Sequence, residues 1–261
     1  MTQEEILEKI RYHCELRGLS KWTMQGYYQD AKRFQAHFGK PATKLGLQDV
    51  QSDLHYMHTE RHNATGTINR VMSSMRFLYG IVLEKPLDLS KLPSHRNYRS
   101  FPDIMTREEV ETLFAACDNL RDKTILMTTY GAGLRISEVA NLKVSSIDSA
   151  NMQILIRNGK GGKDRYALLS QANMDILREY WLAYRPKDYL FMSRNHRPMS
   201  TRSIQEAFNK AKALAGIQKK ATMHTLRHCF ATHLLEDGVN IYHIKQLLGH
   251  TNISTTCFYL H

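Results

Sequence analysis

The sequence predicts a mainly α-helical protein of two domains, with a small β-sheet in the second. Apolar residues recur at the three- and four-residue spacing of helices along most of the 261 residues. Residues 92–103 contain two prolines and lack that period, so we expect a linker there. Residues 153–169 are instead typical of two short strands around a glycine-rich turn. The predicted second domain is therefore mixed α+β.

The first domain, residues 1–91, is expected to be all-helical. Helices are predicted from Thr2 to a stop at Gly18, from Ser20 to Gly39, near residues 48–60 and from Thr65 to Leu83. The last of these carries an apolar face made of Ile68, Val71, Met75, Leu78 and Val82. Arg70 and Arg76 fall off that face, so their side chains are expected to reach outward.

The second domain, residues 104–261, is expected to begin with a helix after the linker. Thr106 is followed by Glu109 three residues later, which predicts a capping box. Strands are predicted at 153–157 and 165–169, on either side of the turn NGKGGKD. The remaining predicted helices lie at residues 123–130, from Ile136, near Asn173, at 201–215, from 223 to Gly238, from Asn240 to Gly249 and after Ser254.

Charge favours a polyanionic partner. The chain has 36 Lys and Arg against 25 Asp and Glu, a net charge of +11, and most of the excess lies beyond residue 91. A basic surface of this strength usually meets nucleic acid, although a basic protein without such a partner is the alternative. The linker carries Arg96 and Arg99, so it is expected either to follow a phosphate backbone or to act as a solvated tether.

Other features favour a soluble protein of the cytoplasm. The four cysteines show no CxxC spacing, so neither a disulfide framework nor a zinc knuckle is expected. The N-terminus is charged and periodic, unlike a signal peptide. No apolar run has the length needed to cross a membrane.

Residues 223–261 gather the side chains that suit phosphate chemistry. His224 and Arg227 are three apart near a predicted helix start, so both are expected to leave one face. His250 follows the glycine that ends the next helix, and Tyr259 lies on the last one. Imidazoles and a guanidinium can hold a phosphate, and a phenol can act as its nucleophile.

Two further basic sites precede this stretch. Arg135, in GAGLRISE, is expected at a helix start, where its fork can bind two phosphate oxygens. Glu138 is expected to fix that guanidinium or its helix, and a plain surface Arg–Glu pair is the alternative. Lys160 lies in GKGGK, which is no nucleotide-binding P-loop because a hairpin follows it instead of a helix. The tip, with Lys163 and Arg165, suits a nucleic-acid groove, or is an exposed basic turn.

No metal or other cofactor is expected. His224 and His228 are four apart, but HTLRH lacks the glutamate of the zinc motif HExxH. Glu236 and Asp237 lie at the far end of that helix, so no carboxylate cluster for two metals is visible. A zinc hydrolase remains the alternative that chelation would reveal.

Five motifs together resemble the tyrosine recombinase (phage integrase) family, in its Xer-like or transposon-integrase-like branch. They are GLRISE, GKGGK, HTLRHCFATHLLEDG, LLGH and STTCFYLH, and TMQGYYQDAKRF and TINRVMSSMRFLYG resemble the family's N-terminal domain. The resemblance implies a helical, SAM-like core-binding domain at 1–91, a linker at 92–103 and a catalytic domain at 104–261. It also implies that the two domains form a C-shaped clamp around duplex DNA.

The resemblance also implies a reaction and its residues. Tyr259 would attack a DNA phosphodiester and form a 3′-phosphotyrosine, without metal or ATP. The implied catalytic residues are Arg135, Lys160, His224, Arg227, His250 and Tyr259. The expected DNA contacts are Arg70, Arg76, Lys163, Arg165 and Arg202.

The implied partners are double-stranded DNA with a specific recombination site and further copies of the chain, as a tetramer on two sites in the nucleoid. Integration by a mobile element and resolution of chromosome dimers both fit. A type IB topoisomerase-like enzyme and a non-catalytic DNA-binding relative are the alternatives. Relatives typically carry a tail beyond the tyrosine that docks on a neighbouring subunit. Because the sequence stops two residues after Tyr259, a shortened chain or a variant without that coupling is expected.

Overall fold

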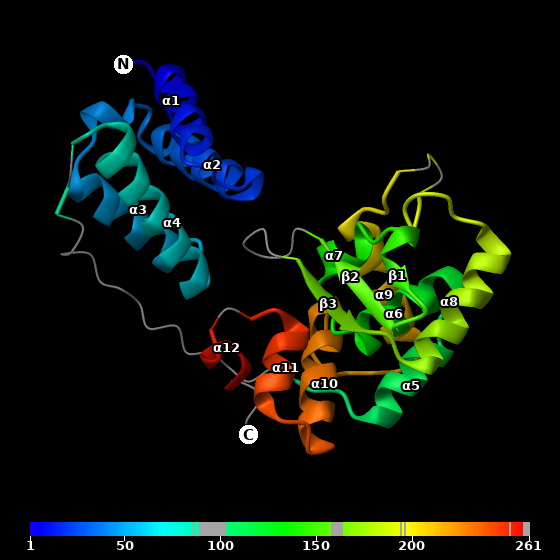
Figure 1. The fold of residues 1–261 in the computed structure, drawn as a ribbon. Helices are drawn as coiled ribbons and strands as arrows, with labels where there is room; N and C mark the ends of the chain where they lie inside the picture. Colours follow the sequence, from blue (N-terminus) through cyan, green and yellow to red (C-terminus); the bar gives the residue numbers. More distant parts are fainter. Residues whose placement is uncertain are drawn as a thin grey trace. The chain divides into compact units, whose positions relative to one another are not determined.

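Helices dominate both parts of the chain in the computed structural model (Figure 1). The structure describes residues 1–85, 87–88, 103–157, 164–193, 195, 197–250 and 252–257. The chain divides into two units, residues 1–100 and residues 101–261. The predicted linker, residues 92–103, lies outside the described residues except for Asp103.

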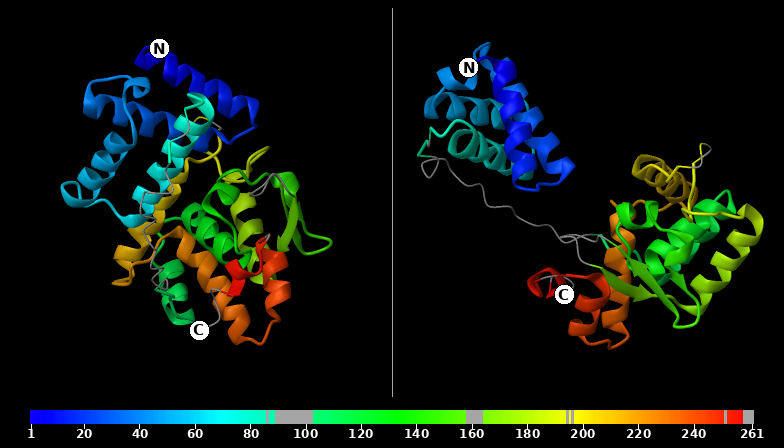
Figure 2. Two further views of the ribbon diagram at one scale, coloured as in Figure 1. Left: turned by 90° about the vertical axis from the view of Figure 1, so that its left-hand side faces the viewer. Right: turned by 45° about the horizontal axis from the view of Figure 1, so that its top comes forward.

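The first unit is helical (Figure 2), and its described residues include a 3₁₀ turn (Ala42–Lys44) and four α-helices. They are α1 (Gln3–Leu16), α2 (Lys21–Phe38), α3 (Leu47–Thr59) and α4 (Thr65–Phe77). Local caps fix their ends: Ser20 caps α2, and Gly39 ends it with a left-handed φ of 63°. The predicted helix 65–83 changes character at Leu78, where a π-helical turn (Leu78–Val82) replaces the α-helix.

The core of this unit forms where the apolar faces of its helices meet. Ile6, Ile10, Phe34, Val71 and Met75 are among its fully buried members. Two charged groups are also buried, and each has a partner. Asp53 accepts two hydrogen bonds of 2.6 Å from the fork of Arg33, and Asp30 is paired with Arg70 and Ser74. These pairs hold α2 to α3 and α2 to α4.

The second unit combines helices with a three-stranded sheet. Its strands are β1 (Ile147–Asp148), β2 (Gln153–Ile156) and β3 (Arg165–Leu168). Its helices are α5 (Arg107–Ala115), α6 (Leu120–Gly131), α7 (Ile136–Ala140), α8 (Gln171–Tyr184), α9 (Thr201–Leu214), α10 (Met223–Glu236), α11 (Ile241–Leu248) and α12 (Ser254–Cys257). The predicted fold class, mainly α with a small sheet, is confirmed.

The sheet is antiparallel, in the order β1-β2-β3. Ile154 pairs with Ala167, and both point into the core, as does Ile156. Tyr166 and Leu168 lie on the opposite, exposed face, as the two-residue period of a strand requires. The pair Ile156 and Arg165 closes the described sheet next to the predicted turn, of which residues 158–163 are not described.

Helix α6 lies inside this unit and packs against α8, α9 and α10. A smaller cluster of Phe230, Ala231, Ile244 and Leu248 joins α10 to α11. This cluster matters for the site, because it packs the end of α11 against the middle of α10. No helix in the described part of the chain is both long and apolar enough to cross a bilayer.

Candidate active site

Arg227 lies at the centre of the site, on the second turn of α10. Thr222 caps this helix, and the side chain of Arg227 is only 1% exposed. Its Nη1 donates 2.6 Å to the carbonyl oxygen of Gly133, and its Nη2 donates 2.6 Å to that of Leu248. Arg227 therefore ties α10 to the turn after α6 and to the end of α11.

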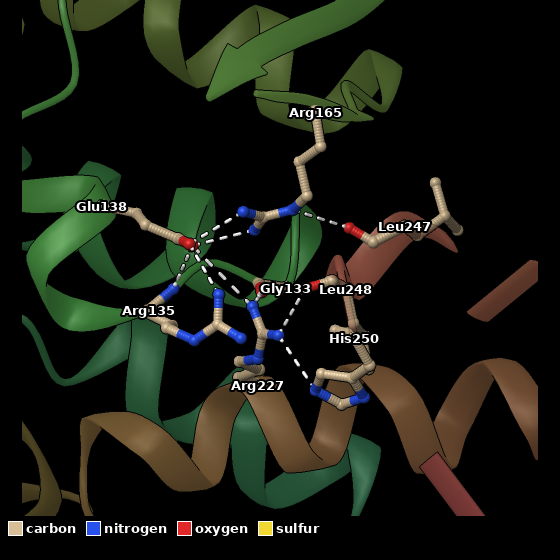
Figure 3. A network of polar contacts seen from close by, with 8 residues as sticks. All are labelled: Gly133, Arg135, Glu138, Arg165, Arg227, Leu247, Leu248 and His250. Carbon is tan, nitrogen blue, oxygen red and sulfur yellow. Dashed lines mark hydrogen bonds and ion pairs between the residues drawn. The ribbon is translucent and has the colours of Figure 1, made fainter. Parts of the chain in front are cut away.

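Glu138, on α7, is the shared carboxylate of this site (Figure 3). Its Oε1 accepts from Nη1 of Arg135 at 2.8 Å and from Nη1 of Arg165 at 2.7 Å. Its Oε2 accepts 2.8 Å bonds from the backbone N–H of Arg135 and from Nη2 of Arg165, and lies 3.7 Å from Nη1 of Arg227. The expectation that Glu138 fixes the guanidinium of Arg135 matches this geometry.

These contacts stabilise the ionised form of Glu138. Its side chain is 7% exposed, and burial on its own would raise the pKa of this carboxyl. The hydrogen bonds and charge of Arg165, followed by those of Arg135, outweigh burial and lower the pKa to about 2. The carboxylate is therefore ionised near pH 7.

Arg165 has a different place from the one expected for a DNA contact at a hairpin tip. Its side chain is 9% exposed, and both Nη atoms of its fork donate hydrogen bonds to the carboxylate of Glu138. Its Nε donates 3.0 Å to the carbonyl oxygen of Leu247. Arg165 lies on the same face of β3 as buried Ala167, two residues later, and β3 packs against α11, so the side chain points inward.

His250 follows Gly249, the left-handed residue that ends α11. Its Nε2 lies 3.2 Å from Nη2 of Arg227, and its Nδ1 lies 2.9 Å from Oγ1 of Thr256 on α12. Burial first, and then the positive charges of Arg227, Arg135 and Arg165, lower the pKa of His250 to about 4. The ring is therefore neutral near pH 7 in the free protein.

His224 is exposed at the first turn of α10, one turn before Arg227. Desolvation, followed by the charges of Arg227 and Arg135, lowers its pKa. Its ring meets that of His228 edge-on, with centroids 4.6 Å apart. A neutral imidazole at this place has a lone pair that can accept a proton.

The described site carries a net positive charge. Three arginines, Arg135, Arg165 and Arg227, surround one ionised carboxylate, Glu138, while His224 and His250 are neutral. The net charge of the four ionised groups is +2. A phosphodiester carries one negative charge, and its five-coordinate transition state carries about two. The cluster is therefore matched to a phosphate that reacts.

Three predicted residues lie outside the described residues: Lys160, Lys163 and Tyr259. Arg96 and Arg99 of the linker do as well. Helix α12 is described to Cys257, two residues before Tyr259 along the chain. Of the predicted catalytic residues, the structure brings together Arg135, Arg227 and His250, with the exposed His224 one turn before Arg227 on α10.

The remaining predicted DNA contacts lie on α4 of the first unit and on α9 of the second. Arg76 is exposed on α4. Arg70, with a side chain 51% exposed, pairs with buried Asp30 of α2. Arg202, 88% exposed on α9, bonds to Glu206 one turn later at 2.8 Å.

Two features of the site had no counterpart in the sequence analysis. Thr256 is fully buried and bonds to His250; it lies within the motif STTCFYLH, but the motif did not single out this threonine. The carbonyl groups of Gly133 and Leu248 hold Arg227, and main-chain acceptors leave no trace in residue identity. Within the described residues, no group of three or more His, Cys, Asp and Glu side chains is placed to hold a metal.

Comparison with protein families gives two matches that together span most of the chain. The model of the phage integrase family matches residues 103–261. The model of the phage integrase N-terminal SAM-like domain matches residues 6–89.

Individual relatives agree. The chain is 35% identical over 277 residues to a tyrosine recombinase of Thermosipho africanus, which covers 99% of this chain and 95% of the relative. Among solved structures, XerH recombinase bound to a palindromic difH substrate in a post-cleavage complex has a TM-score of 0.79 at 18% identity, covering 98% of this chain and 81% of that one. A lambda integrase tetramer bound to a Holliday junction has a TM-score of 0.80 at 15% identity, covering 98% and 77%. These two likenesses concern the fold.

Proposed function

This chain belongs to the phage integrase family and is a tyrosine recombinase, an enzyme that cleaves and rejoins DNA at specific sites; we propose that it does so through Tyr259. The observation that carries this mechanism is the cluster of Arg135, Arg165 and Arg227 around Glu138, with its net positive charge and neutral imidazoles. A phosphate with developing charge is the ligand that such a site stabilises best.

In the first step, the phenolate oxygen of Tyr259 attacks phosphorus and displaces the 5′-oxygen. The P–O bond to tyrosine forms as the P–O bond to the 5′-oxygen breaks, which leaves a 3′-phosphotyrosine and a 5′-hydroxyl. His224 accepts the phenol proton, a role that its lowered pKa favours because the ring is neutral before the reaction. Lys160 donates a proton to the leaving 5′-oxygen.

Arg135 and Arg227 bind the nonbridging oxygens. Arg135 keeps Nε and Nη2 for this purpose, because only its Nη1 is bonded to Glu138. Arg227 adds its positive charge from the centre of the site. An anionic phosphate beside His250 favours the protonated ring, so His250 becomes a donor to the phosphate once DNA is bound. In the second step, a 5′-hydroxyl of another strand attacks phosphorus and releases Tyr259. The energy of the phosphodiester is conserved, so neither ATP nor metal is needed.

The proposed partners are duplex DNA with a recombination site and further copies of this chain. The lambda integrase tetramer on a Holliday junction supports an assembly of four subunits on two sites. Exchange between two duplexes requires four strand cleavages, one for each subunit. We place this activity in the nucleoid, in the cytoplasm.

A library of nicked duplexes with randomised sequence tests the proposal and finds the recombination site at the same time. A nick close to the cleaved phosphate lets the short 5′-hydroxyl strand diffuse away, which traps the covalent complex. We expect protein attached to a 3′ end, in the presence of EDTA, on a defined subset of sequences. No adduct, an adduct that needs a divalent metal, or attachment to a 5′ end would contradict the mechanism.

A further inference from the structure

We propose that Arg165 is a positioning residue that couples the base of the hairpin to the arginine cluster and does not contact DNA. This inference rests on the proposed function. Arg165 joins three elements that are distant in sequence: β3, where it lies; α7, through Glu138; and the end of α11, through Leu247.

The geometry at Glu138 uses the whole fork of Arg165. Two parallel bonds of 2.7 Å and 2.8 Å join the guanidinium to the carboxylate, and the side chains are 9% and 7% exposed. Arg135 bonds to the same carboxylate from the opposite side. Bidentate pairs fix orientation as well as charge, so Arg165 determines where Glu138 holds Arg135.

The geometry at α11 is equally specific. Nε of Arg165 bonds to the carbonyl oxygen of Leu247, in the last turn of that helix. A Cβ atom on Gly249 would lie 2.6 Å from Cδ of Arg165, so the stem of the arginine lies flat against this glycine. His250 is the next residue. Any displacement of Arg165 is therefore passed to the turn that positions His250.

The position of Arg165 at the start of β3 links its contacts with Glu138 and Leu247 to the hairpin. Arg165 pairs with Ile156 and is the first residue of β3 after the turn that carries Lys160. The guanidinium thus anchors the base of the hairpin to the groups that hold the phosphate. Loss of the anchor uncouples the start of β3 from the cluster, and the proposed role of Lys160, five residues earlier in the sequence, depends on that coupling.

The fork of Arg165 also limits how many hydrogen bonds the guanidinium of Arg135 makes to Glu138. With Arg165 in place, both carboxylate oxygens are saturated by four short hydrogen bonds. Without it, each oxygen keeps only its bond from Arg135, and the open lone pairs attract the remaining guanidinium groups. Arg135 would then turn its free nitrogens toward Glu138 and away from the phosphate.

The experiment compares Arg165→Lys and Arg165→Ala with wild type in two assays. One assay is single-turnover cleavage of the nicked duplex at saturating protein, and the other is the salt dependence of DNA affinity. Lysine keeps the charge but loses the fork, so it guards against a variant that merely fails to fold. Arg157→Lys is the matched control, because Arg157 flanks the other side of the same hairpin and is exposed.

We expect both variants of Arg165 to cleave roughly 10- to 100-fold more slowly, by analogy with the loss of the outer partners that orient metal ligands. The slope of log affinity against log salt should equal that of wild type. Loss of one phosphate contact would lower that slope by about 1. Either a lowered slope or an unchanged cleavage rate in both variants overturns the proposal.

A modified substrate tests the coupling to the hairpin itself. In a 5′-bridging phosphorothiolate, sulfur replaces the leaving oxygen, and a thiolate leaves without a proton because a thiol has a pKa near 8.5. We expect the defect of Arg165→Lys to shrink on this substrate to within about threefold of wild type, since the misaligned general acid is no longer needed. An equal defect on both substrates overturns the coupling. Absence of an adduct with the wild-type protein would instead refute the proposed function.

Discussion

Nη2 of Arg227 donates a hydrogen bond to Nε2 of His250 across 3.2 Å. A guanidinium has no acceptor, so this nitrogen of His250 must hold a lone pair. The proton of the neutral ring is then on Nδ1, which donates to Oγ1 of Thr256 at 2.9 Å. The tautomer of His250 is thus fixed from both sides, and α12, which leads to Tyr259, is tied to the arginine at the centre of the site.

Thr256→Val should slow cleavage, because valine has the shape of threonine but cannot accept the proton of Nδ1. A buried donor left unpaired costs about 1–3 kcal/mol, so we expect single-turnover cleavage to fall about tenfold or more. Thr256→Ser should retain near-normal activity. The matched control is Thr255→Val, whose side chain is exposed on the same helix. Equal rates for the valine variants at 255 and 256 would show that the bond is unimportant.

Acid should destabilise the folded protein well before the carboxylates titrate. The pKa values of His228 and His250 are lowered to about 4, mainly by burial, from an ordinary value of 6.5. Below pH 6.5 these two histidines bind protons in the unfolded chain but stay neutral in the folded chain until the pH approaches 4. The contribution of these histidines to the free energy of unfolding is therefore fully present above pH 6.5, and it is lost as the pH is lowered toward 4.

Urea unfolding between pH about 7.5 and about 4.5 measures this slope. The double variant His228→Gln/His250→Gln should show a flatter profile. It should keep part of the slope, because the pKa values of His224 and His233 are also lowered, first by burial. A profile for the double variant as steep as that of wild type would rule out these two rings as the source.

Gly249→Ala should destabilise the protein more than Gly216→Ala. Both glycines have a left-handed φ, 65° and 67° respectively, so alanine carries the same backbone cost of about 1 kcal/mol at each. Only at Gly249 would the new Cβ also overlap Arg165, whereas nothing lies within 4 Å at Gly216. We expect an additional loss of about 1–3 kcal/mol for Gly249→Ala, measured by urea unfolding. Equal losses would mean that the arginine stem moves aside freely.

Arg76→Ala should weaken DNA binding and leave the fold intact. Arg76 is exposed on α4, so the free energy of unfolding should change by no more than about 0.5 kcal/mol. The slope of log affinity against log salt should fall by about 1 if Arg76 touches a phosphate. Arg70 is a poorer probe, because its removal also takes a partner from buried Asp30. An unchanged slope would remove Arg76 from the DNA-binding surface.

Helix ends were predictable from the sequence because caps act within a few residues. Asn240 accepts from the N–H of Tyr242, Thr106 forms its capping box with Glu109, and Gly249 ends α11 as expected. The strands 153–157 and 165–169 were found to within one residue. Strand β1 was missed because two residues are too few to show a period.

The role of Arg165 could not be predicted, since its partners are 27 and 82 residues away in the chain. Its position beside a basic turn suggested an exposed contact. The fold instead packs it against the carboxylate of Glu138, for which the sequence had indicated Arg135 as the partner. Spacing along a helix indicated the pair Arg135 and Glu138, but only the packed structure shows that one carboxylate serves three arginines.

The central claim is that Tyr259 carries the DNA strand, and peptide mapping of the trapped adduct tests it most directly. The covalent complex on a nicked duplex is digested with nuclease and protease, and the peptide that retains a nucleotide is sequenced by mass spectrometry. We predict that the 3′-phosphate is on Tyr259 and that Tyr259→Phe gives no adduct. A nucleotide on any other residue, or an adduct that persists in Tyr259→Phe, would contradict the proposed mechanism.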